Sequence, residues 1–297
     1  MVFKDKEYIL ELTQLWKGER FFDGRPRVPD AILERIRGIK LEEVWAYLLR
    51  HGYNFQYEGG LKTTQPDMQL VGRAVTAIMV PSRPDMQEAT MKSLVAEGKR
   101  GMFQWVLDEL VENDVVVADC YDKVRNCTFL GGNLSTNIAR RTIRGGAVIW
   151  GGIRDLQQIK EITSTQIYYR DTDLGWMRDG LISAANHPCR IGRATCLPGD
   201  IVFGTVSGVL FIPPHLAEEA VVHAEKTKIR DVFGFERISA GVYTAGQIDT
   251  RWSSEIFEDF LAWFKTDDRA APFRHLDWTQ ELEESRRQDD GMQTTIG

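Results

Sequence analysis

Apolar residues in the N-terminal part of the chain recur every three or four positions. Ile9, Leu12 and Trp16 share one face at this spacing, which is the period of an amphipathic helix. A second helix is expected to begin at Pro29-Asp30, and a third is expected to span 41–49. Residues 1–67 therefore predict a helical N-terminal extension.

From Leu70 onward the pattern changes to apolar, β-branched runs separated by helical periods. The run Asp-Val-Val-Val-Ala-Asp at 114–119 predicts a buried strand. Such an alternation of strand and helix indicates an α/β sandwich. The expected strands are 71–80, 114–119, 147–150, 166–170, 201–203 and 208–212, and the expected helices are 85–110 with a break at 98–101, the run that follows Gly132, 156–162 and 215–233.

The C-terminal part predicts one further helix, 253–265, with a wide apolar face that includes Phe260 and Trp263. We expect this face to pack on the body of the protein or on another subunit. The polar residues 280–297 are expected to fray. The predicted division is a helical extension at 1–67, a core domain at 68–235, and a C-terminal helical extension and tail at 236–297.

Composition narrows the function classes. The 297 residues carry a net charge of −6, which argues against a basic nucleic-acid-binding face. Apolar runs such as 204–214 are shorter than the roughly 18 residues that a membrane span needs. The first residues are charged and do not resemble a signal peptide. We therefore expect a soluble, cytoplasmic protein with no nucleic-acid or membrane partner.

Two glycine-containing segments carry the candidate chemistry. They are Gly-Gly-Asn-Leu at 131–134 and Gly-Gly-Ile-Arg-Asp at 151–155, where a strand ends and a helix begins. Glycine lets backbone approach a ligand closely, and exposed helix starts offer N–H groups to an anion. Arg154 beside Asp155 can bind an anionic substrate with one group and a hard cation with the other. This pattern favours an enzyme site for a small molecule.

Plainer interpretations stay open for both segments. Asp155 suits the first turn of a helix because of the helix dipole, whatever else it does. Asn133 or Ser135 could serve only as a helix N-cap.

Five segments, taken in order, resemble the RraA-like family. That family includes 4-hydroxy-4-methyl-2-oxoglutarate aldolases, which are class II pyruvate aldolases, oxaloacetate decarboxylases, and a non-catalytic regulator of ribonuclease E. The resemblance implies a β/β/α swivelling-type sandwich, assembled as a homotrimer or homohexamer with active sites between subunits. The segments are 70–76, 114–119, 132–134, 151–155 and 198–209, and the resemblance covers about 68–235.

The resemblance also implies a metal site. In the family's aldolases an acid, twenty further residues and then Arg-Asp build a site for Mg²⁺ or Mn²⁺. By this match Asp155 is the metal ligand and Arg154 contacts the substrate. Asn133 stands where the family has its acid, and Gln158 stands where the motif has a later one. Two motif positions have therefore lost their charge.

The same match implies the remaining roles. Gly131, Gly132, Asn133 and Leu134 would bind the substrate carboxylate, partly through backbone N–H groups. The match leaves the base unassigned, since Asn133 cannot accept a proton as a carboxylate can, and Asp119 at the end of its strand is the nearest candidate in the sequence. A turn or helix-capping role for Asp119 is about equally compatible with the sequence.

The expected function is a divalent-metal-dependent lyase that cleaves a C–C bond of a small anionic 2-oxo acid, by aldol cleavage or decarboxylation, through a metal-stabilised enolate. A non-catalytic regulatory oligomer of the same fold is one alternative. A metal-dependent hydratase or dehydratase acting on a sugar acid is another. The sequence names neither the natural substrate nor the metal.

Overall fold

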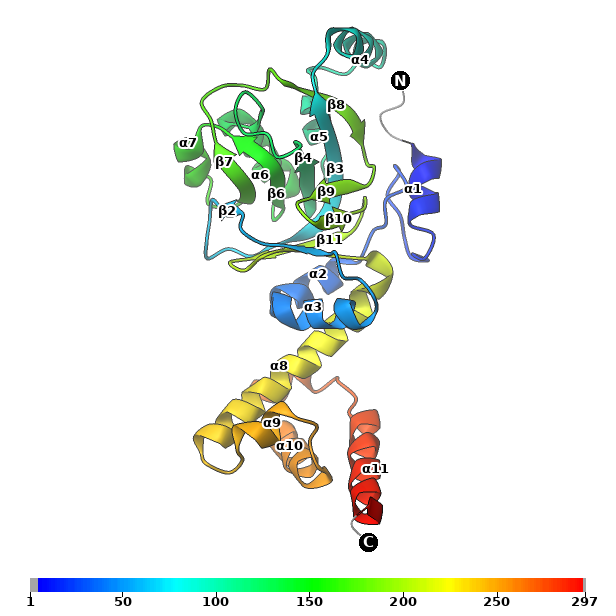
Figure 1. The fold of residues 1–297 in the computed structure, drawn as a ribbon, viewed down its shortest axis with the longest axis vertical. Helices are drawn as coiled ribbons and strands as arrows, with labels where there is room; N and C mark the ends of the chain where they lie inside the picture. The colour runs from blue at the N-terminus through cyan, green and yellow to red at the C-terminus, as the bar shows by residue number, and fades with distance from the viewer. Residues whose placement is uncertain (1–4, 296–297) are drawn as a thin grey trace. The chain divides into compact units, whose positions relative to one another are not determined.

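The structure, a computed structural model, describes the backbone of residues 5–295 and the side chains of residues 5–287 (Figure 1). The chain divides into two compact units, Met1–Ala220 and Val221–Gly297. The sheets lie in the first unit, and the second is helical. The expected boundaries at 67/68 and 235/236 stay predictions.

A large mixed sheet forms the centre of the first unit. Its strand order is β1-β12-β11-β3-β4-β6-β7-β2, with β8 paired to β3 and β5 paired to β6. The middle strands β3, β4, β6 and β7 are mutually parallel, so their carboxyl ends share one edge. These strands are β3 (Leu70–Pro81), β4 (Asp114–Asp119), β6 (Gly146–Ile153) and β7 (Gln166–Thr172).

Antiparallel strands extend the sheet on both sides, and β9 and β10 form a small sheet of their own. The sequence pattern did not predict six of the strands, of which β5 pairs in parallel with β6, because most are two or three residues long and depend on pairing with distant strands. The six are β1 (Tyr57–Glu58), β2 (Lys62–Thr63), β5 (Thr128–Leu130), β8 (Gly180–Ala185), β9 (Cys189–Ile191) and β10 (Ala194–Cys196); the predicted pair is β11 (Ile201–Thr205) and β12 (Gly208–Ile212).

Alternate residues of the buried strands face different layers, as the strand geometry requires. Val116 and Ala118 join a core with the helices, whereas Val115 and Val117 join a core that includes the β9–β10 sheet. The layers are therefore helix, large sheet and small sheet (Figure 1), and the predicted α/β fold of β/β/α type is confirmed. The helices of the first core are α4 (Pro84–Ala96), α5 (Gln104–Asp108), α6 (Gly132–Thr142) and α7 (Leu156–Glu161).

The N-terminal extension is attached to the sheet by ion pairs. The Arg25 guanidinium lies 3.0 Å from Asp114 at the start of β4, and both side chains are buried. Asp30 pairs with Arg73 of β3. A buried pair needs both members, because either alone would be an uncompensated charge. The helices of the N-terminal extension are α1 (Lys6–Leu12), α2 (Asp30–Arg37) and α3 (Leu41–Arg50), as the periodicity predicts.

The second unit packs around aromatic rings. Phe260 and Trp263 of the predicted C-terminal helix lie against Phe233, Trp252 and Trp278 of the same unit. The apolar face is therefore covered by residues of its own unit, among them Ile229 and Phe233, which lie in the predicted core domain 68–235. Packing on the predicted body is confirmed at these residues, and packing on another subunit stays a prediction. The helices are α8 (Ala217–Ser239), which crosses the division between the units, α9 (Ala245–Asp249), α10 (Ser254–Thr266), η2 (Asp268–Phe273) and α11 (Thr279–Thr295); η1 (Pro214–Leu216) precedes α8.

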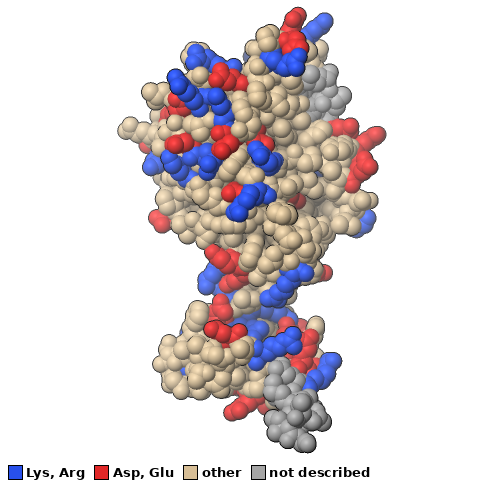
Figure 2. All heavy atoms as spheres, viewed as in Figure 1, with Lys and Arg blue, Asp and Glu red and all other residues tan. Residues whose placement is uncertain are grey.

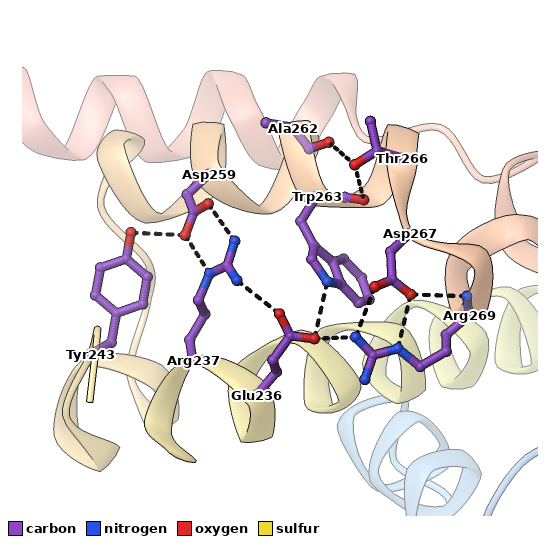
Figure 3. Close-up of polar contacts among 9 residues, drawn as sticks. All are labelled: Glu236, Arg237, Tyr243, Asp259, Ala262, Trp263, Thr266, Asp267 and Arg269. Atoms are coloured by element: carbon purple, nitrogen blue, oxygen red, sulfur yellow. Dashed lines mark hydrogen bonds and ion pairs between the residues drawn. The ribbon is translucent and has the colours of Figure 1, made fainter. Parts of the chain in front are cut away.

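Polar contacts fix α8 against α10 (Figure 3). Arg237 forms two hydrogen bonds with Asp259, of 2.8 and 2.7 Å, and Tyr243 donates to the same carboxylate. Arg269 adds an ion pair with Glu236. The residues expected to fray from 280 onward form α11 instead, as far as residue 295.

Charges of both signs are interspersed on the face drawn in Figure 2, without one continuous basic area. Within the described residues, every helix is too short or too polar to cross a membrane.

Candidate functional site

Asp155 lies at the junction of β6 and α7, in the left-handed conformation with φ 56° and ψ 36°. Its side chain makes no cap hydrogen bond to its own helix. The carboxylate instead accepts a hydrogen bond from the Gly132 N–H at the start of α6, at 3.2 Å from Oδ2. Asp155 therefore holds the N-cap position of α7, as the plainer interpretation expects, but its carboxylate contacts another helix.

Neighbouring side chains leave no room for a Cβ atom at Gly131 or Gly132. A Cβ atom on Gly131 would lie 2.6 Å from Asp155 Oδ2 and 3.1 Å from Arg154 Nε. A Cβ on Gly132 would overlap the Gln158 side-chain oxygen. The structure thus brings together five residues that the sequence singled out, and the absence of side chains on the two glycines makes the contact possible.

Arg154 and Asp155 form a solvent-exposed ion pair. Nη1 of Arg154 lies 3.4 Å from Asp155 Oδ2, and the two side chains are 43% and 31% exposed. The Arg154 backbone N–H donates to the Leu130 carbonyl, which holds the turn beside β5. A guanidinium and a carboxylate are therefore presented to solvent next to a helix N-terminus.

The second glycine pair has a different role from the one expected. Gly151 and Gly152 lie within β6, not on a turn. Their missing side chains make room for the loop after β4: a Cβ would lie 2.5 Å from the Cys120 Cβ or 2.7 Å from the Val124 carbonyl oxygen. The expectation that these glycines admit a ligand is wrong, because protein backbone occupies the space.

Asn133 and Leu134 occupy the first turn of α6, after the N-cap residue Gly131. No side chain caps this helix, so the alternative that Asn133 or Ser135 is an N-cap is wrong. The Asn133 side chain is exposed, whereas Leu134 packs on the helix-side core. Only the backbone of Leu134 is therefore available to a ligand.

Asp119 ends β4 and lies opposite Trp150 of β6 in the parallel register. It accepts the Tyr121 N–H at 2.8 Å and lies 3.8 Å from Arg190. Burial raises the pKa of Asp119 above its ordinary value. Among the described residues, its contacts do not reach Arg154, although both residues are at the carboxyl edge of the parallel strands.

Comparison with known proteins decides the family. The profile of the family described as RraA-like, Aldolase/RraA, matches residues 29–211, which is more than half of the chain. The chain belongs to the RraA-like family.

Two curated relatives of this RraA-like chain are similar at lower coverage. Protein DlpA of Legionella pneumophila is 27% identical over 168 residues, 55% of this chain and 25% of DlpA. A Halalkalibacterium halodurans protein, which carries the provisional name 4-hydroxy-4-methyl-2-oxoglutarate aldolase, is 28% identical over 138 residues, 46% of this chain and 64% of the relative. The chain thus matches a quarter of one relative and less than two thirds of the other.

A solved structure confirms the RraA-like fold. Streptomyces coelicolor RraAS2, described as an unusual member of the RNase ES inhibitor RraA protein family, superposes with a TM-score of 0.60. The superposition covers 71% of this chain and 97% of RraAS2, at 23% identity. At this identity the likeness extends to the fold alone.

The donor set for a metal is small in this RraA-like chain. The described residues contain no group of three or more His, Cys, Asp and Glu side chains placed to share an ion. The hydrogen bond and the ion pair of Asp155 both reach Oδ2, so Oδ1 is the oxygen with which it could bind a cation. One carboxylate is enough for Mg²⁺ when substrate oxygens and water complete the coordination.

The turn after β4 is a feature that the sequence did not predict. Tyr121 and Asp122 both have positive φ, 44° and 59°, although neither is glycine. The Tyr121 hydroxyl donates to the Asp179 carbonyl, and the turn packs on Gly151. Left-handed non-glycine residues cost energy and often lie beside functional sites. A sequence without glycine at these positions gives no signal for this conformation.

Proposed function

We propose that this chain is a divalent-metal-dependent lyase that cleaves a C–C bond of a small 2-oxo acid. The observation that carries the proposal is the contact of the Gly131-Gly132 backbone with Asp155 and Arg154. It sets a cation-binding carboxylate, an anion-binding guanidinium and a helix N-terminus side by side. These are the groups that a small oxo acid and a hard cation need together.

The substrate carboxylate is assigned to Arg154 and to the start of α6. The first N–H groups of a helix have no partner within the helix, and the Gly132 N–H is used by Asp155. The N–H groups of Asn133 and Leu134 then remain for the substrate. Arg154 adds a two-pronged contact that fixes the carboxylate in one orientation.

Asp155 would hold the cation through Oδ1, while its Oδ2 stays on Gly132 and Arg154. Mg²⁺ or Mn²⁺ bound there would supply positive charge to the ketone oxygen as it gains electron density during C–C cleavage. The Arg154 guanidinium would lie near the same ketone oxygen, so it would also stabilise the negative charge that develops there.

Asp119 is our candidate base for an aldol cleavage, in which the distal hydroxyl loses a proton. Burial raises its pKa, which makes its carboxylate a stronger base than an exposed one. A decarboxylation needs no base for bond breaking. With Asn133 uncharged and exposed in place of an acid, we propose that decarboxylation is the better retained activity.

A regulatory role is the second candidate. Asn133 and Gln158 stand where the resemblance implies acids, and the fold is shared with a protein described as a member of an RNase ES inhibitor family. In that case the Arg154-Asp155 turn would bind no catalytic metal.

The proposed assembly is a homotrimer or homohexamer, as the family resemblance implies. Light scattering on the purified protein tests it directly. A mass three or six times 33.9 kDa is expected, and a 33.9 kDa species at working concentration would exclude the assembly.

The decisive assay for the function follows pyruvate from oxaloacetate with Mn²⁺ or Mg²⁺ present. The rate with the ion alone is subtracted, because divalent ions decarboxylate oxaloacetate without protein. We expect turnover in the wild type, none in Asp155→Ala, and wild-type turnover in the exposed control Asp67→Ala. No metal-dependent rate above the ion alone would favour the regulatory role.

A further inference from the structure

A cavity lies in the first unit, and neither Arg154 nor Asp155 lines it. Its volume is about 210 Å³, and residues of the N-terminal extension, of β10 and of η1 line it together with Asp200. Pockets for drug-sized ligands are larger, at roughly 300–1,000 Å³. The cavity therefore suits a compact molecule.

Asp200 is the charged residue of this cavity, and its side chain is buried with 3% exposure. Its Oδ2 accepts the Leu197 N–H at 2.8 Å. Burial raises the pKa of Asp200 to about 8, with only the Leu197 N–H acting against it. The Arg20 guanidinium donates to the Thr13 hydroxyl and to the Thr13 and Trp16 carbonyls, rather than to Asp200. Within the described residues, Asp200 thus has no cation partner.

Two further titratable groups of the cavity, Tyr53 and His215, contact each other. The Tyr53 hydroxyl lies 3.0 Å from His215 Nε2. Burial lowers the pKa of His215, so its ring is neutral at pH 7 and adds no positive charge. A ligand cation entering here would meet one carboxylate and no repelling imidazolium.

The remaining wall is mostly apolar and partly aromatic, and it also includes the polar residues Thr13, Gln56 and Thr195. Leu12, Trp16 and Pro214 line it, and Tyr53 contributes a second aromatic ring. Apolar walls favour an apolar ligand body, and aromatic rings also attract organic cations. A bare inorganic ion would leave these walls uncovered and would find too few oxygen ligands.

We propose that this cavity is a binding site for a small organic ammonium compound, with the ammonium group paired to the Asp200 carboxylate and the apolar body against Trp16 and Tyr53. The site is separate from the proposed lyase chemistry and does not depend on it.

Calorimetry with three probes of similar size tests the proposal: benzylammonium, benzyl alcohol and benzoate. We expect benzylammonium to bind the wild type at least tenfold more tightly than the alcohol, and benzoate not to bind. Asp200→Asn keeps an acceptor for the Leu197 N–H and should abolish this preference. The exposed control Asp67→Asn should keep it.

Proton release gives a second readout on the wild type alone. Binding of an ammonium group should ionise Asp200, so close to one proton should be released at pH 7, measured in two buffers of different ionisation enthalpy. This result decides the case even if Asp200→Asn does not fold. Equal binding of the three probes, no binding of any, binding without proton release, or equally tight binding of NH₄⁺ would each overturn the proposal.

Discussion

Asp155 and Asp200 belong to the same unit of the protein but have opposite surroundings. Asp155 is 31% exposed on its side chain and contacts a guanidinium and a backbone N–H. Asp200 is buried, accepts one N–H and has a pKa raised to about 8. The partnered, exposed carboxylate is suited to holding a hydrated metal ion, and the isolated, buried one is suited to pairing with an organic cation that brings its own apolar surface.

The packing around the two carboxylates also differs. At Asp155, missing side chains on Gly131 and Gly132 let a helix start approach the carboxylate. At Asp200, the side chain is buried beside a cavity whose wall is mostly apolar. The first arrangement preserves the charge for chemistry. The second makes the charge costly until a ligand compensates it.

The largest expected effect is a pH-dependent gain of stability in Asp200→Asn. The folded-state pKa, about 8, lies above the unfolded value near 4, so ionisation destabilises the wild-type fold as pH rises from about 4 to about 8. The neutral variant escapes this cost. Relative to wild type, its free energy of unfolding should rise by roughly 3 kcal/mol between pH 5 and pH 8. Urea unfolding at both pH values measures it, and a pH-independent difference would contradict the account.

The next largest effect is expected for Gly131→Ala. Its Cβ would lie 2.6 Å from Asp155 Oδ2 and would push the carboxylate from its place. We predict a loss of metal-dependent pyruvate formation of about 100-fold, or about 2.7 kcal/mol. Gly246→Ala is the matched control, because the nearest side-chain atom to its Cβ would be Thr244 Oγ1, 4.0 Å away. Equal rates in the two variants would show that the contact between Gly131 and Asp155 does not contribute to activity.

A smaller effect is expected for Arg154→Lys. Lysine keeps the charge but loses the planar fork that grips a carboxylate with two hydrogen bonds. KM for oxaloacetate should rise about tenfold, with a smaller change in kcat. Steady-state kinetics at saturating Mn²⁺ separates the two constants. A fall in kcat at constant KM would assign Arg154 to the chemical step alone.

The smallest effect is expected for Asn133→Asp. A carboxylate at this exposed position adds negative charge near the proposed cation, so Mn²⁺ affinity should rise a few-fold. Cleavage of 4-hydroxy-4-methyl-2-oxoglutarate should gain relative to oxaloacetate decarboxylation. If wild type already cleaves the aldol substrate efficiently and the variant changes nothing, Asp119→Asn is the next variant to assay.

The sequence predicted the parts of this fold that local pattern controls. Strand β4 begins and ends at the predicted residues, Asp114 and Asp119, because its buried apolar run is unbroken. The contact of 131–132 with Arg154-Asp155 was expected from family resemblance and not from spacing, since it joins residues 23 positions apart. Neither the loop that covers Gly151-Gly152 nor the Asp200 cavity has a local signature, because each depends on segments distant in the chain.

The central claim is that Asp155, and not Asp200, is the carboxylate for a divalent cation. Titration of Mn²⁺ by electron paramagnetic resonance, with pyruvate present to complete the coordination, tests it on wild type, Asp155→Ala and Asp200→Asn. The account predicts that Asp155→Ala loses Mn²⁺ binding, whereas Asp200→Asn binds Mn²⁺ as the wild type does. An unchanged titration in Asp155→Ala would contradict it.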